Sequence, residues 1–453
     1  MPQLPQAPPD TKSPRRLNHL PPSSQQLPPT APSPPKPQPY GQTLLEMIAI
    51  SGEYPAPSLS ALIPSPSYAK KVITALTNDK LIKTVYKNGV RGYRLASRGK
   101  KRLLRGNMER FQSYLMGDVE TNRVRTEHTR RLRLHSMAEV YTIMYNAGVE
   151  IFQDLKPKLY GNGNQEALPL VDEIPSQTNI GNLNNNTTPT TVNPSNGNPI
   201  IQHAPASSHT PKPQPLPTHI TAPHFYSSRE QKPKETKSNS IRGSRASGTL
   251  LTPNQVLAVY NTGSTLIKWP DTEQRYKLEL RDDLCWGKFR QQYRTTEVGG
   301  ILMGTNMEIL QRYLETKPKG RQHAPLHFLI NSYSPLYYIT NDKHGVAQLK
   351  LLCTPQAHNA LHQMMGMGYL PQNPKSDIEH DAMTKDGNPV LFCCLIDIPR
   401  LIRFQNGLSM SGRSGSVICF DFQKEVIGGY LGDRVELKVV NFEKFRQKFF
   451  PEG

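Results

Sequence analysis

Proline is concentrated in two stretches of this sequence, and these stretches limit how much of the chain can fold. Of the 42 prolines among 453 residues, residues 1–40 hold 14 and residues 161–249 hold 12. Proline has no amide donor and interrupts helices and strands, and few large apolar residues accompany it here. We therefore expect a disordered proline-rich tail over 1–40 and a disordered linker over 161–223. Two folded parts remain, and a linker of this length allows them to move independently or to fold back on each other.

The apolar runs and the cysteines restrict the class of protein further. The longest apolar stretches, such as 390–398, are far shorter than the ~20 residues that span a bilayer. The N-terminus MPQLPQAPPD lacks the basic start and apolar core of a secretory signal. The five cysteines form no CxxC motif, which favours reduced core thiols over disulfides or a zinc site. These features predict a cytoplasmic protein with no membrane partner and no metal cofactor.

Positive charge is concentrated near the start of the folded chain. The formal net charge is +19, and residues 41–160 carry 20 basic and 10 acidic residues. Residues 80–108 hold ten basic residues and no acidic one, whereas residues 224–453 spread 30 basic and 22 acidic residues over a longer segment. A charge run is often only a solvated surface. A run this free of acids nevertheless favours a polyanionic partner.

Three helices are predicted before this basic run. The segment TLLEMIAISG repeats apolar residues at helical spacing and stops at Ser51-Gly52, and SLSALIP predicts a short second helix that ends at Pro64. Ser65 and Pro66 are typical of the cap and first position of a third helix. One face of that helix is apolar: Ala69, Val72, Ile73 and Leu76.

A hairpin is predicted after the third helix. The segment LIKTVYKNGVRGYRL forms two strands around Asn88-Gly89, the preferred pair for a type I′ turn, and Ser97 can cap a further helix to Leu104. Three helices followed by a hairpin are the order of a winged helix-turn-helix, whose third helix lies in the major groove of DNA. We therefore predict an α+β winged helix-turn-helix domain over 41–110 that binds double-stranded DNA. Protein contacts or RNA binding are the alternative uses of such a domain.

The residues expected to contact DNA lie on the polar face of the third helix and on the hairpin. On the helix they are Ser67, Tyr68, Lys70, Lys71 and Thr74; on the hairpin they are Lys87, Asn88, Arg91 and Arg94. Other cations lie beside or after the hairpin: Lys83, Arg98, Lys100, Lys101, Arg102 and Arg105. If four to six of these cations met phosphates, log K would fall against log salt with a slope of about −4 to −5.

The remaining segments predict a long helix and a second domain. Residues 111–160 read as a long helix that is basic at first and then apolar up to Gly148, so that 124–147 serves either a homodimer or a contact with the next domain. Residues 224–453 predict an α/β domain of unknown role. VLAVYN and STLIKW suggest a strand pair around Thr262-Gly263, and VLFCCLID, SVICFD and VELKVV, each followed by a helical stretch, favour a parallel sheet.

Few residues in the second domain suggest catalysis. There is no GxxxxGK[ST] motif, and His358 and His362, one helical turn apart, lack a third ligand nearby in sequence. Asp397 and Asp421 follow apolar strands, and Glu436-x-Lys438 resembles the ExK element of metal-dependent nucleases. We expect a binding protein rather than an enzyme, with helix capping by the two aspartates. A nuclease or nickase that uses Asp397, Asp421, Glu436, Lys438 and Mg²⁺ is the alternative.

The predicted winged helix and the segment RLRLHSMAEVYTIMYNAG resemble the replication-relaxation proteins of bacterial plasmids and integrative elements. The segments FYSSRE, IRGSRASGTLL and VYNTGSTLIKW are similar to large uncharacterised members of that family. The resemblance implies DNA binding in plasmid replication or relaxation, with replication or conjugation proteins as partners and no settled catalytic residues. A transcription regulator is the alternative.

Overall fold

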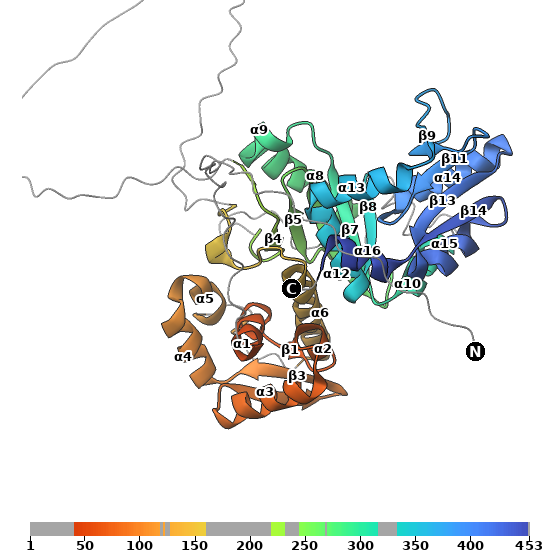
Figure 1. Cartoon of the computed structure of the whole chain (residues 1–453). Helices are drawn as coiled ribbons and strands as arrows, with labels where there is room; N and C mark the ends of the chain where they lie inside the picture. The colour runs from red at the N-terminus through yellow and green to blue at the C-terminus, as the bar shows by residue number, and fades with distance from the viewer. Residues whose placement is uncertain are drawn as a thin grey trace, which may run out of the picture. The chain divides into compact units, whose positions relative to one another are not determined.

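The structure is a computed structural model, and it describes residues 40–117, 121–122, 127–159, 219–231, 244–267, 270–315 and 333–451. The predicted tail and most of the predicted linker, residues 1–39 and 160–218, lie outside the described residues. The fold is mixed α/β, with helices around three sheets (Figure 1). Among the described residues, no helix has the length and apolar character needed to cross a membrane.

The three predicted N-terminal helices are confirmed. They are α1 (Tyr40–Ser51), α2 (Leu59–Leu62) and α3 (Pro66–Asn78). The Ser65 hydroxyl accepts a hydrogen bond from the Tyr68 amide at 3.4 Å, and Pro66 occupies the first helical position, as the sequence predicts. Since Ala69, Val72 and Leu76 are buried, the opposite face of α3 is left to solvent.

The predicted hairpin is also confirmed. Strands β2 (Ile82–Lys87) and β3 (Val90–Leu95) pair antiparallel, and β1 (Tyr54–Pro55) adds to β3 in the order β1-β3-β2. Asn88 and Gly89 have φ angles of 51° and 76°, which the two-residue turn requires. Helix α4 (Ser97–Gly106) follows, although the Ser97 side chain does not cap it because Ala96 occupies the cap position.

The predicted long helix over 111–160 is confirmed only in its second part, and its bounds are wrong. The described residues form two helices there, α5 (Met108–Leu115) and α6 (His128–Asn146). The second half of α6 is apolar, as predicted, and it is buried within the chain, so this face is an internal contact rather than an open dimer surface. Its buried members are Ala138, Val140, Tyr141, Thr142, Ile143 and Met144.

The larger sheet has the order β12-β8-β7-β6-β5-β4. Its strands are β4 (His224–Ser227), β5 (Gly248–Leu251), β6 (Val256–Gly263), β7 (Val298–Gly304), β8 (Leu336–Thr340) and β12 (Ile396–Asp397). Strands β6, β7 and β8 are parallel, and the outer pairs are antiparallel. The predicted strand STLIKW is wrong, because β6 pairs with β5 and β7 and its chain leaves the sheet after Gly263.

The smaller sheet has the order β14-β13-β11-β10-β9. Its strands are β9 (Leu370–Pro371), β10 (Ala382–Met383), β11 (Pro389–Phe392), β13 (Gly415–Phe420) and β14 (Val435–Val440). The predicted parallel pairing of the last strands is confirmed for β11, β13 and β14. The apolar run VLFCCLID is not one strand, however, since β11 lies in this sheet and β12 in the larger one.

Helices and a π-helical segment surround these two sheets (Figure 1). They are α8 (Pro270–Leu280), the π-helical segment Arg281–Lys288, α9 (Arg290–Tyr293), α10 (Met307–Glu315), α12 (Lys343–Cys353), α13 (Pro355–Gly366), α14 (Ile398–Ser411), α15 (Lys424–Leu431) and α16 (Phe442–Phe449).

One hydrophobic core joins the N-terminal helices to the larger sheet. Leu45 and Ile48 of α1 and Met144 of α6 belong to the same buried cluster as Leu257 of β6 and Ile301 of β7. Residues 40–453 accordingly form one compact unit, in which the two predicted folded parts pack against each other. Ile220, at the end of the predicted linker, is buried and its amide donates to Gln292 at 2.7 Å, so the packed chain resumes before Phe225.

Candidate nucleic-acid interface

The polar face of α3 is exposed along its whole length. Ser67, Tyr68, Lys70, Lys71 and Thr74 are all exposed, as the sequence predicts. The helix is fixed from behind by its buried apolar face and at its start by the Ser65 cap. Serine, threonine and lysine are among the residue types that contact base edges and phosphates in protein–DNA complexes.

The hairpin adds exposed residues beside α3. Lys87, Asn88 and Arg91 are exposed at its turn. Tyr86, which the sequence prediction omitted, is 72% exposed and lies directly across from Arg91 in the strand register. The period of two along the strand places Tyr86 on one face with Thr84, which is also exposed, and this alternation is the signal that could have revealed it.

Arg94 does not belong to this exposed set. It is 6% exposed, and its guanidinium pairs with Glu53, with Nε 2.7 Å from Oε2. On β3 it points away from its buried neighbours Tyr93 and Leu95, toward the side of the sheet that α6 covers. The prediction that Arg94 binds phosphate is therefore wrong in this arrangement.

Glu53 is the centre of a buried charged cluster that we call the Glu53 cluster: Glu53, Arg94, Arg131 and His135. Glu53 is fully buried, and Arg131 is 1% exposed. Arg131 Nε and His135 Nε2 lie 3.1 and 2.9 Å from Glu53 Oε1. Burial alone would raise the pKa of Glu53, but the hydrogen bonds from His135, Arg131 and Arg94 outweigh it and lower the pKa to about 2.

The Glu53 cluster also holds the hairpin in place. Arg131 of α6 donates to the carbonyl oxygens of Val85 at 3.2 Å and Lys87 at 3.1 Å, both on β2. Gly92 of β3 permits this close approach, since a Cβ there would lie 2.7 Å from His135 Nε2 and against Glu53 Oε1. The exposed turn of the hairpin is thus supported from behind by α6.

Helix α6 is in turn attached to the larger sheet. The Asn261 side-chain amide on β6 donates to the Ser136 carbonyl at 3.0 Å and to Glu139 at 3.2 Å, and the rings of Tyr141 and Phe225 meet edge to face at 5.7 Å. On its other side, Thr142 bonds the Tyr54 hydroxyl at 3.0 Å. These contacts connect the helices and hairpin of the candidate interface to the second half of the chain.

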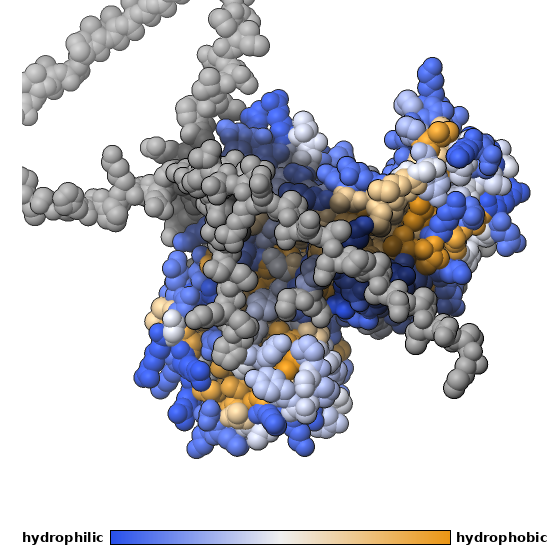
Figure 2. Space-filling view, in the orientation of Figure 1, coloured by the Kyte–Doolittle hydropathy of each residue, from blue (hydrophilic) through white to orange (hydrophobic). Residues whose placement is uncertain are grey.

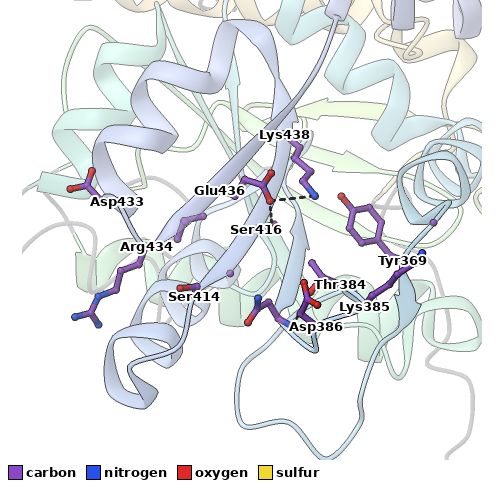
Figure 3. A pocket seen from close by; sticks show the side chains of 14 residues that line it. Tyr369, Thr384, Lys385, Asp386, Ser414, Ser416, Asp433, Arg434, Glu436 and Lys438 are labelled. Carbon is purple, nitrogen blue, oxygen red and sulfur yellow. Dashed lines mark hydrogen bonds and ion pairs between the residues drawn. The ribbon is translucent and has the colours of Figure 1, made fainter.

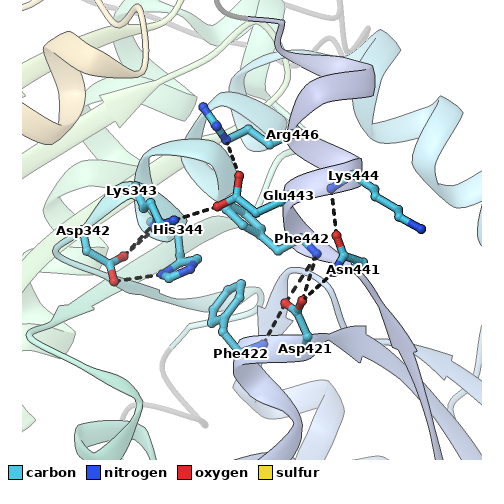
Figure 4. Close-up of polar contacts among 11 residues, drawn as sticks. Asp342, Lys343, His344, Asp421, Phe422, Asn441, Phe442, Glu443, Lys444 and Arg446 are labelled. Atoms are coloured by element: carbon cyan, nitrogen blue, oxygen red, sulfur yellow. Dashed lines mark hydrogen bonds and ion pairs between the residues drawn. The ribbon is translucent and has the colours of Figure 1, made fainter.

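Asp421, a candidate for metal binding, is occupied by local contacts at the end of β13. Its carboxylate accepts hydrogen bonds from the amides of Phe422 at 2.9 Å and Phe442 at 3.3 Å, and from the Asn441 side chain at 3.2 Å (Figure 4). It thereby ties the end of β13 to the start of α16. The expected helix cap by Asp421 is nevertheless wrong, because Gln423 occupies the cap position of α15 and Asn441 that of α16.

The neighbours of Asp421 join the two sheets. His344, at the start of α12, bonds Asp342 through Nδ1 at 2.9 Å and stacks on the Phe422 ring with centroids 4.2 Å apart (Figure 4). Phe442 meets the same imidazole at 4.7 Å. A histidine held between a carboxylate and two phenyl rings is a packing contact between the sheets.

Glu436 and Lys438 lie at a different place on β14. They form an ion pair of 3.3 Å, and Ser416 donates to Glu436 at 3.1 Å (Figure 3). They line an open hollow of about 590 Å³ with both acidic and basic walls, including Lys385, Asp386, Asp433 and Arg434. Ser416 pairs with Glu436 and Phe420 with Val440 in the register, so Glu436 and Asp421 lie at opposite ends of the strand pair.

Asp397 lies in the other sheet. It occupies the N-cap position of α14, as expected, but its side chain accepts the Leu336 amide of β8 at 3.1 Å and makes no capping hydrogen bond to α14. Burial raises its pKa to about 6, against the opposing effects of that amide and of Arg400. The four residues of the nuclease alternative therefore occupy three separate places: Asp397, Asp421, and the pair Glu436 and Lys438. The structure does not bring them together as one metal site.

His358 and His362 are neighbours on α13, with ring centroids 4.6 Å apart. Burial lowers the pKa of both imidazoles. In the part of the chain that the structure describes, no group of three metal-ligating side chains includes them.

Comparison of the chain with protein-family models, curated proteins and solved structures found no match.

Proposed function

We propose that the protein binds double-stranded DNA in a sequence-specific manner and that residues 40–106 act as a winged helix-turn-helix. The order of α1, α2, α3 and an antiparallel hairpin supports this proposal. The observation that carries it is the face of α3, where Lys70, Lys71 and Thr74 are exposed while the opposite side is buried.

In this proposal α3 lies in the major groove. Its 13 residues extend about 20 Å, enough to cross a groove about 12 Å wide. Lys70 and Lys71 donate to acceptors on base edges, and Ser67 and Thr74 reach bases or phosphates. Lys87 and Arg91 at the hairpin turn neutralise phosphates of the flanking backbone.

The resemblance to replication-relaxation proteins supports a role for this binding in the replication or relaxation of a plasmid or integrative element. Replication or conjugation proteins would then be partners of the DNA-bound protein. The acidic candidates add no support for a nuclease, because Asp397, Asp421 and Glu436 lie apart.

The test is binding to a duplex site selected from a random library with the full-length chain. Lys70→Ala and Lys71→Ala are each expected to weaken binding by about 1–3 kcal/mol for each lost base contact and to relax the base preference at that position. Lys444→Ala is the matched control, because Lys444 is an exposed lysine on α16. If all three variants bind the selected site like the wild type, the assignment of α3 is wrong.

A further inference from the structure

Helix α4 carries a stripe of cations on one face. Arg98, Lys101, Arg102 and Arg105 follow the spacing i, i+3, i+4, i+7, which places them on the same side of the helix, and all four are exposed. Gly99 and Leu103 on the opposite side are buried. Hydrophilic residues accordingly gather over α4 in the space-filling view (Figure 2).

These four cations have no acidic partner among the residues that the structure describes. The ion pairs in this part of the chain are made by other arginines and lysines. Lys100, which lies beside the stripe, instead bonds the neutral side chain of Asn122. Like charges one turn apart repel one another. An external polyanion would relieve this repulsion.

The position of α4 relates it to α3. The Leu81 carbonyl, three residues beyond α3, accepts the Ala96 amide at 2.9 Å, and Gly99 of α4 stands against the same oxygen. The stripe therefore starts near the C-terminal end of α3. The turn with Lys87 and Arg91 is at the other end of the hairpin, about 20 Å away for strands of six residues.

We propose that the exposed face of α4 binds the phosphate backbone of the same duplex that α3 reads. This inference rests on the proposed function and extends the DNA contact to the far end of the hairpin. The stripe spans seven residues of rise, about 11 Å, and successive phosphates of one strand advance about 3.4 Å along the duplex axis. Four long cationic side chains over that length can reach several neighbouring phosphates of one strand. The periodic charge of a backbone thus fits the stripe without any base contact.

The test replaces Arg98, Lys101, Arg102 and Arg105 together by Gln in the full-length chain. Affinity for the selected duplex is measured from 50 to 300 mM NaCl, and the backbone is mapped by hydroxyl-radical footprinting. The slope of log K against log salt is expected to become less negative by about 0.9 for each lost phosphate contact, or about 3 in total. One protected backbone segment disappears, and the base preference is unchanged.

Two further variants separate this role from net charge and from folding. Replacing Lys375, Lys424, Arg434 and Lys444 by Gln removes four exposed cations elsewhere and is expected to leave the footprint intact. Replacing Arg98, Arg102 and Arg105 by Lys keeps the charge and is expected to keep the slope.

Three results overturn the inference. If the α4 variant retains the wild-type slope and footprint while Lys70→Ala binds weakly, the inference fails and the proposed function stands. The inference also fails if the fourfold Gln variant of α4 and the fourfold Gln variant of the cations elsewhere change the slope of log K against log salt equally. If the wild type binds no duplex, both proposals fail together.

Discussion

Surface arginines have different surroundings on α14, beside the smaller sheet, and on α4, in the N-terminal part of the chain. Beside the smaller sheet, two arginines face carboxylates: Arg400 bonds Glu379 and Asp381 at 2.9 and 2.8 Å, and Arg403 bonds Glu379 at 2.6 Å. On α3, the hairpin turn and the stripe of α4, the described cations have no such partners. The net charge alone therefore says little about binding, because cations that form ion pairs within the protein are not available to an external anion. What distinguishes α4 is that four such cations follow one another on a single exposed helical face.

Two buried carboxylates, one in each half of the molecule, have pKa values shifted in opposite directions. Glu53 has three nitrogen-bearing partners and a pKa of about 2, whereas Asp397 has one backbone amide and a pKa of about 6. Both side chains are removed from water. The difference shows that burial favours the neutral acid unless hydrogen bonds and charges oppose it, as they do around Glu53.

The largest expected effect is the loss of the Glu53 charge. Glu53→Gln leaves Arg94 and Arg131 buried without their carboxylate, which should lower the free energy of unfolding by about 3–5 kcal/mol at pH 7. Urea denaturation followed by circular dichroism measures it. Glu443→Gln, which removes an exposed carboxylate paired with Lys343, is the control and should change stability little.

The same variant has a defined pH dependence. Because folding depresses the pKa of Glu53, its contribution is fully present above pH ~4.5 and is lost as the pH falls toward about 2. The stability gap between wild type and Glu53→Gln should therefore narrow across that range. A gap of equal size at pH 7 and pH 2.5 would contradict the assigned role of the carboxylate.

Asp397 should respond in the reverse direction. Its raised pKa means that ionisation opposes folding above about pH 6 and has no effect below the unfolded value of ~3.9. Asp397→Asn keeps an oxygen for the Leu336 amide and should stabilise the protein by up to about 2 kcal/mol at pH 8, with no gain at pH 3.5. Thermal unfolding at the two pH values measures it, and destabilisation at pH 8 would show that Arg400 needs the Asp397 charge.

The sequence predicted those parts of the candidate interface that depend on neighbouring residues. Ser65-Pro66 defines the start of α3, and Asn88-Gly89 defines the turn, because a helix cap and a type I′ turn each depend on a few consecutive residues. The exposed face of α3 then follows from helical periodicity alone.

The sequence did not predict features that depend on distant contacts. Arg94 alternates with Tyr93 and Leu95 and so points out of the first core, but α6, more than 30 residues later, covers that side. The run VLFCCLID has no internal turn residue, yet it divides between two sheets because each end finds a different partner strand. The sequence also did not show that Asp421 and Glu436 lie at opposite ends of the pair β13 and β14, because this depends on the register of the two strands.

The prediction with the smallest expected effect concerns whether the cations of α4 lack acidic partners within the protein. Arg98 lies near the N-terminus of α4, where a cation opposes the helix dipole and repels Lys101 and Arg102. Arg98→Gln should stabilise the free protein by about 0.3–1 kcal/mol at low salt, with the gain vanishing at 1 M NaCl because salt screens both terms. Arg403→Gln, which breaks the pair with Glu379, should instead destabilise. Chemical denaturation of both variants at two salt concentrations measures this, and a loss of stability in Arg98→Gln would mean that Arg98 has an internal partner and that the stripe is not reserved for an external anion.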